Sequence, residues 1–240
     1  MLRLDKWLAE MTEGSRAEVK KWIRQGRVYV NETKVQRPET KLDPGRDQVT
    51  LDGEQIIYEQ FCYYMLNKPA GVVSATTDRE HKTVIDLLQE ANTQDVFPVG
   101  RLDIDTEGLL LLTNDGALAH ELLSPRKHVD KTYFVRIAGN LSDADVKQLE
   151  QGMDIGDEKL TLPAKVSCLE QFPEEQEQTV MIKLREGRYH QVKRMLASRG
   201  KPVTELKRLS IGALELDKSL LPGQFRQLTE KELCSVNKKK

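Results

Sequence analysis

Apolar and polar positions near the N-terminus follow two helical patterns in succession. The apolar positions of the first pattern are Leu4, Trp7, Leu8 and Met11. Their spacing predicts a short amphipathic helix over residues 2–11. Ser15 and Glu18 then form a capping-box signature, which predicts the start of a second helix. That helix is expected to run to about Gln25, because Gly26 is placed to end it.

Short alternating runs follow the second helix and predict strands. The predicted strands of this part are residues 28–30, 33–35 and 48–51, with turns at 31–32 and 43–45. Residues 52–61 show no clear period, and we expect them to form a connector. The sequence therefore predicts that residues 1–55 form a compact unit of two helices followed by short strands.

The pattern changes at Cys62, where longer strand-like and helical runs begin. Strands are predicted at 63–66, 109–113, 132–138 and 180–184, and helices at 84–90, 117–122, 144–151 and 190–199. The first of these strands ends in a turn cluster at 67–71, and 173–178 reads as a polar loop between strands. Strands and helices mix without a strict βαβ alternation, which favours an α+β fold.

Composition and charge narrow the classes of protein only slightly. The 240 residues carry a formal net charge of −1, so the overall balance indicates no anionic partner. The cysteines Cys62, Cys168 and Cys234 are too widely spaced for a metal or disulfide framework, which fits a reduced cytosol. The N-terminus does not resemble a signal peptide, and no run approaches the roughly 18 apolar residues of a membrane span. We expect a cytoplasmic protein with no membrane contact.

Local charge is uneven along the second predicted helix. Its basic residues are Arg16, Lys20, Lys21, Arg24 and Arg27, against the single acid Glu18. At 100° per residue, Arg16, Lys20 and Arg24 form one stripe beside an apolar face. A solvated helix face and a phosphate-binding surface both remain open for this stripe.

A second basic segment covers residues 181–210. It has nine basic residues, Lys183, Arg185, Arg188, Lys193, Arg194, Arg199, Lys201, Lys207 and Arg208, against the two acids Glu186 and Glu205. Such a concentration in a nearly neutral chain predicts a polyanionic partner. Aromatic residues make up 5% of the chain, so a broad stacking platform is not expected, although one or two aromatics could hold a flipped base.

Three aspartates surround the run of four leucines at 109–112. Asp115 lies in an Asn-Asp-Gly turn signal, and Asp105 fits a residue that shapes a loop through its own backbone. Asp103 follows Arg101 on a stretch between two glycines. From spacing alone, Asp103 is equally an ion-pair partner or an active-site acid, because a nucleophilic carboxylate also needs a nearby cation.

No other catalytic constellation is visible in the sequence. The histidines His81, His120, His128 and His190 have no metal-ligand spacing. A serine nucleophile elbow and a phosphate-binding glycine loop are both missing. We therefore expect no cofactor and no metal.

The stretch that contains Asp103 resembles the active-site motif of RNA pseudouridine synthases of the small-subunit rRNA (RsuA) type. The matching motifs are GRLDIDTEGLLLLTNDG at 100–116, SPR at 124–126, KTY at 131–133, EGRYHQVKRM at 186–195 and ELKRLSIG at 205–212. Residues 1–55 resemble the S4 RNA-binding domain, through RLDK at 3–6 and GRVYVN at 26–31. The resemblance covers nearly the whole chain in the family's order.

This resemblance implies a role for each matched side chain. Asp103 would be the catalytic aspartate, which attacks either C1′ of the ribose or C6 of the uracil. Tyr133 would stack on the target base, and Leu206 would lie beneath it. Lys193 would pair with the aspartate. Arginine is more usual at its position, so Arg188 remains the second candidate for that pairing.

Further contacts implied by the resemblance are made to RNA. Arg101 and Arg188 would contact the substrate around the target nucleotide. The S4-like part would bind RNA through Arg3, Lys6, Arg16, Lys20, Lys21, Arg24 and Arg27. A basic set of this size fits phosphate contacts, which are independent of sequence.

The resemblance implies an α+β fold with two domains. A small S4-like RNA-binding domain covers residues 1–58, and a catalytic domain with a mixed, largely antiparallel sheet flanked by helices covers 62–232. Residues 233–240 are expected to form a tail. The expected partner is small-subunit ribosomal RNA, as naked RNA or an assembly particle, bound by a monomer. Tyr189 and His190 resemble the small-subunit enzymes, which favours a 16S rRNA uridine equivalent to position 516. A 23S rRNA uridine, a non-catalytic rRNA-binding assembly factor and a carboxylate-dependent glycosidase are the alternatives.

Overall fold

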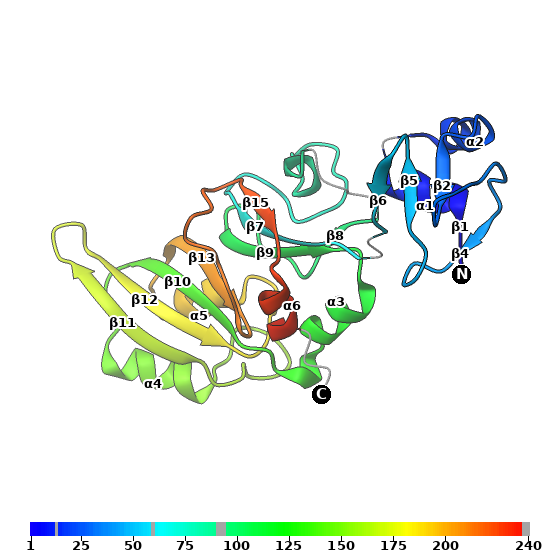
Figure 1. Cartoon of the computed structure of the whole chain (residues 1–240). Helices are drawn as coiled ribbons and strands as arrows, with labels where there is room; N and C mark the ends of the chain where they lie inside the picture. The colour runs from blue at the N-terminus through cyan, green and yellow to red at the C-terminus, as the bar shows by residue number, and fades with distance from the viewer. Residues whose placement is uncertain (13, 59–60, 90–94, 237–240) are drawn as a thin grey trace. The chain divides into compact units, whose positions relative to one another are not determined.

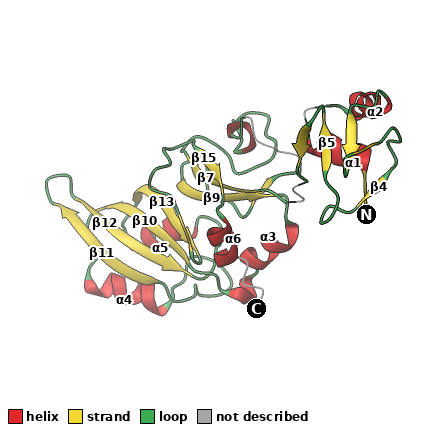
Figure 2. Cartoon of the chain, in the orientation of Figure 1, coloured by secondary structure: helices red, strands yellow, loops and turns green. Residues whose placement is uncertain are grey.

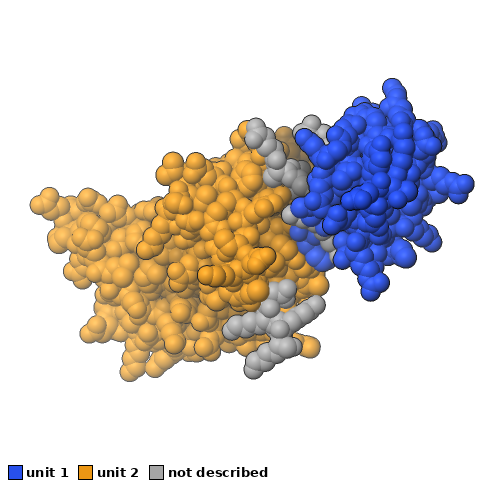
Figure 3. All heavy atoms as spheres, viewed as in Figure 1, with its two compact units in different colours: residues 1–61 blue, residues 62–240 orange. Residues whose placement is uncertain are grey.

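The structure, a computed structural model of the chain, describes residues 1–12, 14–58, 61–89 and 95–236. It divides into two compact units, residues 1–61 and residues 62–240 (Figure 3). Each unit has a hydrophobic core of its own. The two units are therefore described separately.

The first unit packs two helices against short strands. Its elements are α1 (Leu4–Met11), α2 (Arg16–Arg24), β1 (Leu2–Arg3), β2 (Val28–Val30), β3 (Thr33–Lys34), β4 (Lys41–Leu42), β5 (Val49–Leu51) and β6 (Glu54–Ile56). Strands β3-β2-β5-β6 form one sheet, and β1 pairs with β4. The capping box of Ser15 and Glu18 is confirmed, and Leu4, Leu8 and Ile23 are fully buried in the core of this unit.

The predicted connector over 52–61 is wrong for residues 54–56, which form β6 against β5. Asp52 and Gly53, at φ +53° and +90°, make the tight turn between the two strands. An Asp-Gly pair with positive φ at both residues is a strong hairpin signal, because it matches the twist of the flanking strands. That signal is present in the sequence even though the following strand is short.

The second unit is built on one nine-stranded sheet (Figure 1). Its strands are β7 (Tyr63–Lys68), β8 (Phe97–Pro98), β9 (Glu107–Thr113), β10 (Lys131–Ala138), β11 (Lys165–Phe172), β12 (Glu177–Leu184), β13 (Val203–Ile211), β14 (Leu214–Glu215) and β15 (Phe225–Gln227). The main order is β11-β12-β10-β13-β9-β7-β15, with β14 beside β13 and β8 beside β9. The pairing of β13 with β9 is parallel and the other described pairings are antiparallel. The expected α+β fold with a largely antiparallel sheet is confirmed.

Helices cover both faces of this sheet (Figure 2). They are α3 (Gly116–Leu123), α4 (Asp143–Gln151), α5 (Gln191–Ala197) and α6 (Glu230–Val236), with 3-10 turns η1 (Ile85–Leu87) and η2 (Pro125–Lys127). Leu110 and Leu112 pack in the core that α4 and α5 cover. Leu109 and Leu111 pack in the core that α3 and α6 cover. The four-leucine run is apolar throughout because both faces of β9 are buried.

Three predictions for this unit need correction. The polar loop expected at 173–178 is wrong for 177–178, because these two residues begin β12. The helix expected at 84–90 is only the short turn η1, and Glu90 lies outside the described residues. The tail expected at 233–240 is wrong for 233–236, because these residues form the end of α6. Leu233 packs against a core cluster that contains the buried Val236, so this segment is part of the folded unit. Residues 237–240 lie outside the described part.

Gly108 allows the close parallel contact between β9 and β13. It lies opposite Arg208 in the strand register, at φ +100°. A Cβ atom built at Gly108 would lie 2.2 Å from the backbone oxygen of Arg208. Only glycine therefore fits at this position, both sterically and in its backbone conformation.

Candidate active site

Asp103 lies on the loop that precedes β9, and this loop closes around a buried lysine. Lys68, at the end of β7, is fully buried. Its Nζ donates to the backbone oxygens of Asp103 (3.0 Å), Ile104 (3.3 Å) and Thr106 (2.8 Å), and also to that of Pro69 (3.0 Å). Burial lowers the pKa of Lys68 to about 8, and the nearby Asp105 and Asp103 carboxylates oppose that shift. Lys68 therefore holds the backbone of the Asp103 loop in one conformation.

The Asp103 carboxylate meets two residues from the start of α5. Lys193 Nζ lies 3.2 Å from Oδ2, and His190 Nε2 lies 3.4 Å from Oδ1. Lys193 also donates to Asp105, and this hydrogen bond lowers the pKa of Asp105. The Asp103 side chain remains 27% exposed, so it is held in place while it stays accessible.

Arg188, the second candidate partner of Asp103, is bound elsewhere. Its guanidinium contacts Glu186 at 3.0 Å and Asp157 at 3.3 Å. It also donates to the backbone oxygens of Lys159 and Leu160 at 2.6 and 2.7 Å. Lys193, and not Arg188, is therefore the partner of Asp103 in the structure.

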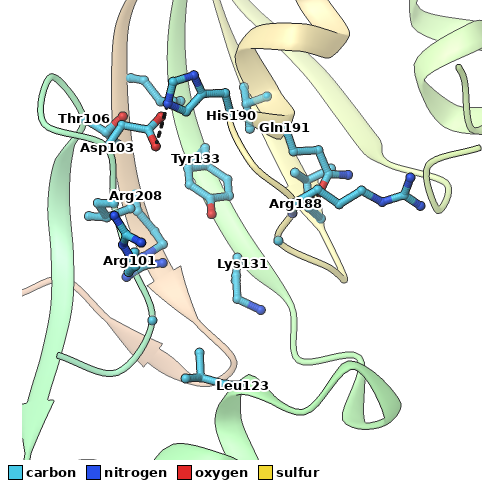
Figure 4. Close-up of a pocket in the computed structure, with 16 residues that line it drawn as sticks. Arg101, Asp103, Thr106, Leu123, Lys131, Tyr133, Arg188, His190, Gln191 and Arg208 are labelled. Atoms are coloured by element: carbon cyan, nitrogen blue, oxygen red, sulfur yellow. Dashed lines mark hydrogen bonds and ion pairs between the residues drawn. The ribbon is translucent and has the colours of Figure 1, made fainter. Parts of the chain in front are cut away.

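A pocket opens beside the Asp103 carboxylate (Figure 4). Five of the residues singled out from the sequence line it: Arg101, Asp103, Tyr133, Arg188 and Leu206. Lys193 does not line the pocket but contacts the Asp103 carboxylate. Figure 4 shows the Tyr133 ring in the middle of the pocket. Asp103 and His190 lie on one side of the ring, and Lys131 lies on the opposite side. The pocket encloses about 140 Å³, close to the about 150 Å³ of an apolar cavity that admits benzene. A single six-membered ring therefore fits.

The floor of the pocket comes from neighbouring strands β10 and β13. Tyr133 pairs with Arg208, and Val135 pairs with Leu206, in the antiparallel register. Tyr133 and Leu206 are 8% and 6% exposed, so each shows only a small part of its surface to the pocket. An aromatic face and an aliphatic side chain on one sheet surface can together hold a planar ring.

Two cations of the pocket were not among the residues selected from the sequence. Arg208 is 3% exposed; its Nε donates to the Leu109 backbone oxygen at 2.9 Å, and its Nη2 has no hydrogen-bond partner among the described residues. Lys131 is partly buried and its Nζ donates to the Val129 backbone oxygen at 3.1 Å. Burial lowers the pKa of both groups, and the charge of Arg208 lowers that of Lys131 further.

Six of the nine basic residues in segment 181–210 form ion pairs with acids from other parts of the chain, and Lys193, which contacts Asp103 and Asp105, is one of them. Lys183 and Arg185 contact Asp130; Arg188 and Arg194 contact Asp157; Arg199 contacts Asp145. The segment is therefore not a free polyanion-binding rim along its whole length. Ion pairs of this kind fix loops against α5, and they contribute little net positive field.

The remaining aspartates have structural roles. Asp115 caps α3 by accepting from the amides of Ala117 and Leu118, and it also accepts from the Tyr63 hydroxyl. The expected structural role is confirmed, although the residue begins a helix instead of a hairpin turn. Asp105 is 67% exposed and binds Lys193, so it does more than shape its own loop.

The basic residues of the first unit fall into two groups. Arg3, Lys6 and Arg27 form ion pairs with Asp5, Glu10 and Asp52 respectively. Arg16, Lys21 and Arg24 are exposed on α2, Lys20 is partly exposed, and none of these four makes an ion pair with a residue that the structure describes. The stripe on α2 is therefore available for an external anion.

The sequence analysis assigned no individual site role to Lys68, His190, Lys131 or Arg208. The sequence around Lys68 contains one signal of its role. A lysine just after the apolar strand-like run 63–66 would be buried with that strand, and a buried lysine needs hydrogen-bond partners. The described residues contain no cluster of histidine, cysteine and acidic side chains that could hold a metal ion. None of the helices in the described part is long and apolar enough to cross a membrane.

Comparisons with known proteins agree on both units. The family described as RNA pseudouridylate synthase matches residues 62–198, and the S4 domain matches residues 2–47. A Bacillus subtilis protein named uncharacterized RNA pseudouridine synthase YtzG is 45% identical over 237 residues, which is 98% of each chain. Ribosomal small subunit pseudouridine synthase A of Escherichia coli is 43% identical over 98% of this chain and 100% of its own length.

A solved structure is similar along the same length. It is titled crystal structure of pseudouridylate synthase, with 34% sequence identity and a TM-score of 0.66. The alignment covers 98% of this chain and 100% of that one. The similarity therefore includes both units.

Proposed function

This chain belongs to the RNA pseudouridylate synthase family and carries an S4 domain, and from that basis we propose that it isomerises one uridine of 16S rRNA with Asp103 as the nucleophile. Relatives at 42–43% identity are named for the small ribosomal subunit, which supports the choice of RNA. The proposed target is the uridine equivalent to position 516. The protein would act as a cytoplasmic monomer.

One observation carries the proposal: the accessible Asp103 carboxylate, held by Lys193 and His190, opens onto a pocket of the size of one pyrimidine ring. Asp103 attacks C1′ of the ribose or C6 of the base. The C1′–N1 bond breaks, the uracil rotates in the pocket, and C5 bonds to C1′ as the bond to Asp103 is broken. The C5 proton is then lost and N1 gains a proton. The product is an isomer of the substrate, so the proposed chemistry uses no cofactor.

The neighbouring residues would bind the flipped nucleotide. Tyr133 stacks on the base and Leu206 lies beneath it, which offsets the cost of removing the base from its helix. Arg101, exposed at the pocket, contacts the phosphate backbone. Arg188 lines the pocket while its guanidinium is held by acids, so it shapes the rim that the nucleotide meets.

The first unit, proposed as the S4 domain over residues 1–58, would bind rRNA outside the target nucleotide. The proposed contacts are Arg3, Lys6, Arg16, Lys20, Lys21, Arg24 and Arg27. The α2 residues without an ion pair should contribute most to RNA affinity. A cation that is already paired with a carboxylate must first lose that contact, which costs part of the free energy gained by binding phosphate. The catalytic domain is proposed to cover residues 62–232.

The alternative functions are less well supported. A 23S rRNA target would use the same chemistry, so only the mapping experiment below distinguishes it from a 16S rRNA target. A non-catalytic assembly factor would have no need for the Lys193–Asp103 contact in an open pocket. A glycosidase needs two carboxyl groups across its site, whereas Asp103 is the one carboxylate among the described residues that line the pocket.

The proposal is tested by mapping pseudouridine in rRNA from cells with and without this protein. Loss of one 16S pseudouridine, and its formation by the purified protein on 16S transcripts or small-subunit particles, supports it. Loss of a 23S pseudouridine moves the target to the large subunit. If the pseudouridine maps are unchanged and the purified protein is inactive, the enzyme proposal is wrong and the non-catalytic assembly factor is favoured.

A further inference from the structure

Two pocket-lining cations, the buried Arg208 and the partly buried Lys131, form no ion pair with a described residue. Arg208 is buried; its guanidinium forms hydrogen bonds with the Leu109 backbone oxygen and with the Tyr133 side chain, and its Nη2 has no hydrogen-bond partner among the described residues. Lys131 bonds only to the Val129 backbone oxygen, and neither cation forms an ion pair with a described residue. A buried guanidinium without an anionic partner is costly to keep in a folded protein. Its presence at a pocket indicates use by the ligand.

Both cations lie close to the aromatic floor. Arg208 is the cross-strand neighbour of Tyr133, and their side chains interact. Lys131 lies two residues before Tyr133 on the same strand and on the same face of the sheet. Figure 4 shows Lys131 beyond the Tyr133 ring, away from Asp103. The pocket therefore has an anionic end and a cationic side.

The proposed reaction creates negative charge on the base in either scheme. If Asp103 attacks C1′, the C1′–N1 electron pair leaves with the uracil and spreads over O2 and O4. If Asp103 attacks C6, the electron pair of the C5–C6 double bond moves toward O4. Both C1′ and C6 lie at the glycosidic side of the ring. With that side at Asp103, the ring extends over Tyr133 toward the cations.

We propose that Arg208, assisted by Lys131, stabilises the negative charge that develops on the uracil carbonyl oxygens during the isomerisation. This inference rests on the proposed function of the same pocket. Fixed cations in a site of low dielectric constant stabilise developing charge strongly, because no solvent must reorganise around it. The charge disappears again once C5 has bonded to C1′, the C5 proton has been lost and N1 has gained a proton.

The arrangement also explains why Arg208 has no carboxylate partner. An acid beside the guanidinium would stabilise the free protein, but it would cancel the positive potential that the base anion needs. Arg199, which also follows α5, shows the contrast, since it is bound to Asp145 at 2.8 Å. Arg199 therefore serves as the matched control for a structural arginine.

The test measures single-turnover rates on 16S rRNA transcripts made with uridine or with 5-fluorouridine. Fluorine makes the uracil anion more stable, so the base needs less help from the protein. We expect Arg208→Met to slow cleavage of the C1′–N1 bond on uridine RNA by about 100- to 1000-fold. On fluorouridine RNA the loss should be at least about 10-fold smaller. Lys131→Met should show the same pattern with a smaller loss.

RNA affinity and thermal melting separate this role from binding and from folding. Dissociation constants should stay within about 3-fold of wild type, and Arg208→Lys should recover part of the rate because it keeps a cation. Arg199→Met should lower the melting temperature without changing the uridine-to-fluorouridine rate ratio. Equal rate losses on both RNAs, or a weaker affinity that accounts for the whole loss, would overturn the inference. Wild-type protein that leaves both RNAs unchanged would contradict the proposed function itself.

Discussion

Lys68 Nζ lies 3.0 Å from the backbone oxygen of Asp103, although the two residues are 35 positions apart. The ammonium group is enclosed by four backbone oxygens, three of which belong to the loop that presents the Asp103 carboxylate. The position of the proposed nucleophile therefore depends on a lysine that does not touch the pocket. We expect this dependence to appear in both stability and activity.

Replacing Lys68 by Met removes the donor to four backbone oxygens, of which those of Asp103 and Ile104 keep hydrogen bonds from the amides of Thr106 and Gly71. A buried backbone oxygen that loses its donor costs about 1–3 kcal/mol, with partial relaxation, so the free energy of unfolding should fall by about 3 kcal/mol. Turnover should fall at least about 10-fold because the Asp103 carboxylate loses its fixed position. Urea unfolding and single-turnover assays measure both effects. Lys82→Met, at an exposed position, is the control, and equal behaviour of the two variants would refute this role.

Asp103→Asn keeps the shape of the side chain and removes the nucleophilic charge. We expect pseudouridine formation to be abolished while RNA binding persists, because the pocket floor and the basic surfaces are unchanged. Pseudouridine mapping and filter binding on the same transcript check the two halves. Substantial product from this variant would sink the role proposed for Asp103.

The stripe on α2 should control the salt dependence of RNA binding. Changing Arg16, Lys20 and Arg24 together to Gln should lower the slope of log affinity against log salt by up to about 3, since each phosphate contact contributes about one unit. Melting temperature should hardly change, because these side chains are exposed or partly exposed and form no ion pair with a described residue. A matched change at Arg27, which is bound to Asp52, should affect stability more than the salt slope.

Removal of residues 1–58 should weaken rRNA binding more than it disturbs the rest of the chain. The second unit has its own core, so its melting transition should persist in the shortened protein. Calorimetry and RNA titration measure these two properties. Equal RNA affinity of the full and shortened proteins would contradict the role proposed for the first unit.

Tyr189 is 75% exposed and its ring stacks on His190 with centroids 3.8 Å apart. This exposed ring pair lies next to Asp103 and offers a face to a base that flanks the target. Tyr189→Ala should therefore weaken RNA binding by about 5- to 150-fold, the range of one stacked base. Tyr189→Phe keeps the ring and should bind like wild type. If the two variants bind alike, no base stacks there.

Acid should weaken the attachment of α6 through Glu232. Hydrogen bonds from Arg226, and then from Thr229, lower the pKa of Glu232 to about 2 in the folded chain, below its ordinary 4.5. The unfolded chain therefore takes up a proton first as the pH falls. The contribution of Glu232 is present above about pH 4.5 and is lost toward pH 2. Urea unfolding between pH 5 and 2 should show a shallower slope for Glu232→Gln than for wild type, while Glu230→Gln, at an exposed position, should match wild type.

Local signals predicted the elements whose stabilising contacts lie within a few residues. The capping box at Ser15 and the apolar run of β9 are examples, since neighbouring residues determine each of them. Strand β11 was missed because it is an edge strand whose side chains are mostly exposed, so it has no alternating pattern. Strand β13 was missed because charged residues interrupt its apolar positions.

The site was predictable only in part for a related reason. Motif resemblance selected Asp103, Tyr133 and Leu206, and the fold brings them to one pocket. Arg208 and Lys68 escaped selection because their partners lie far away in the sequence: Arg208 bonds to a residue 99 positions distant. A charged residue inside a strand gives no sign of its burial until the neighbouring strand is known.

The parallel contact of β9 with β13 has a consequence for the order of folding. Gly108 and Arg208 are about one hundred positions apart, so this contact forms only after a long segment has been closed into a loop, which is slow. The antiparallel pairing of β7 with β15 closes a longer segment still. The Asp103 loop lies on one side of this junction and the Tyr133–Leu206 floor on the other. During refolding, helical and strand signals should therefore return before the ability to hold a nucleotide, and the delay between them reports the closure of these long-range strand contacts.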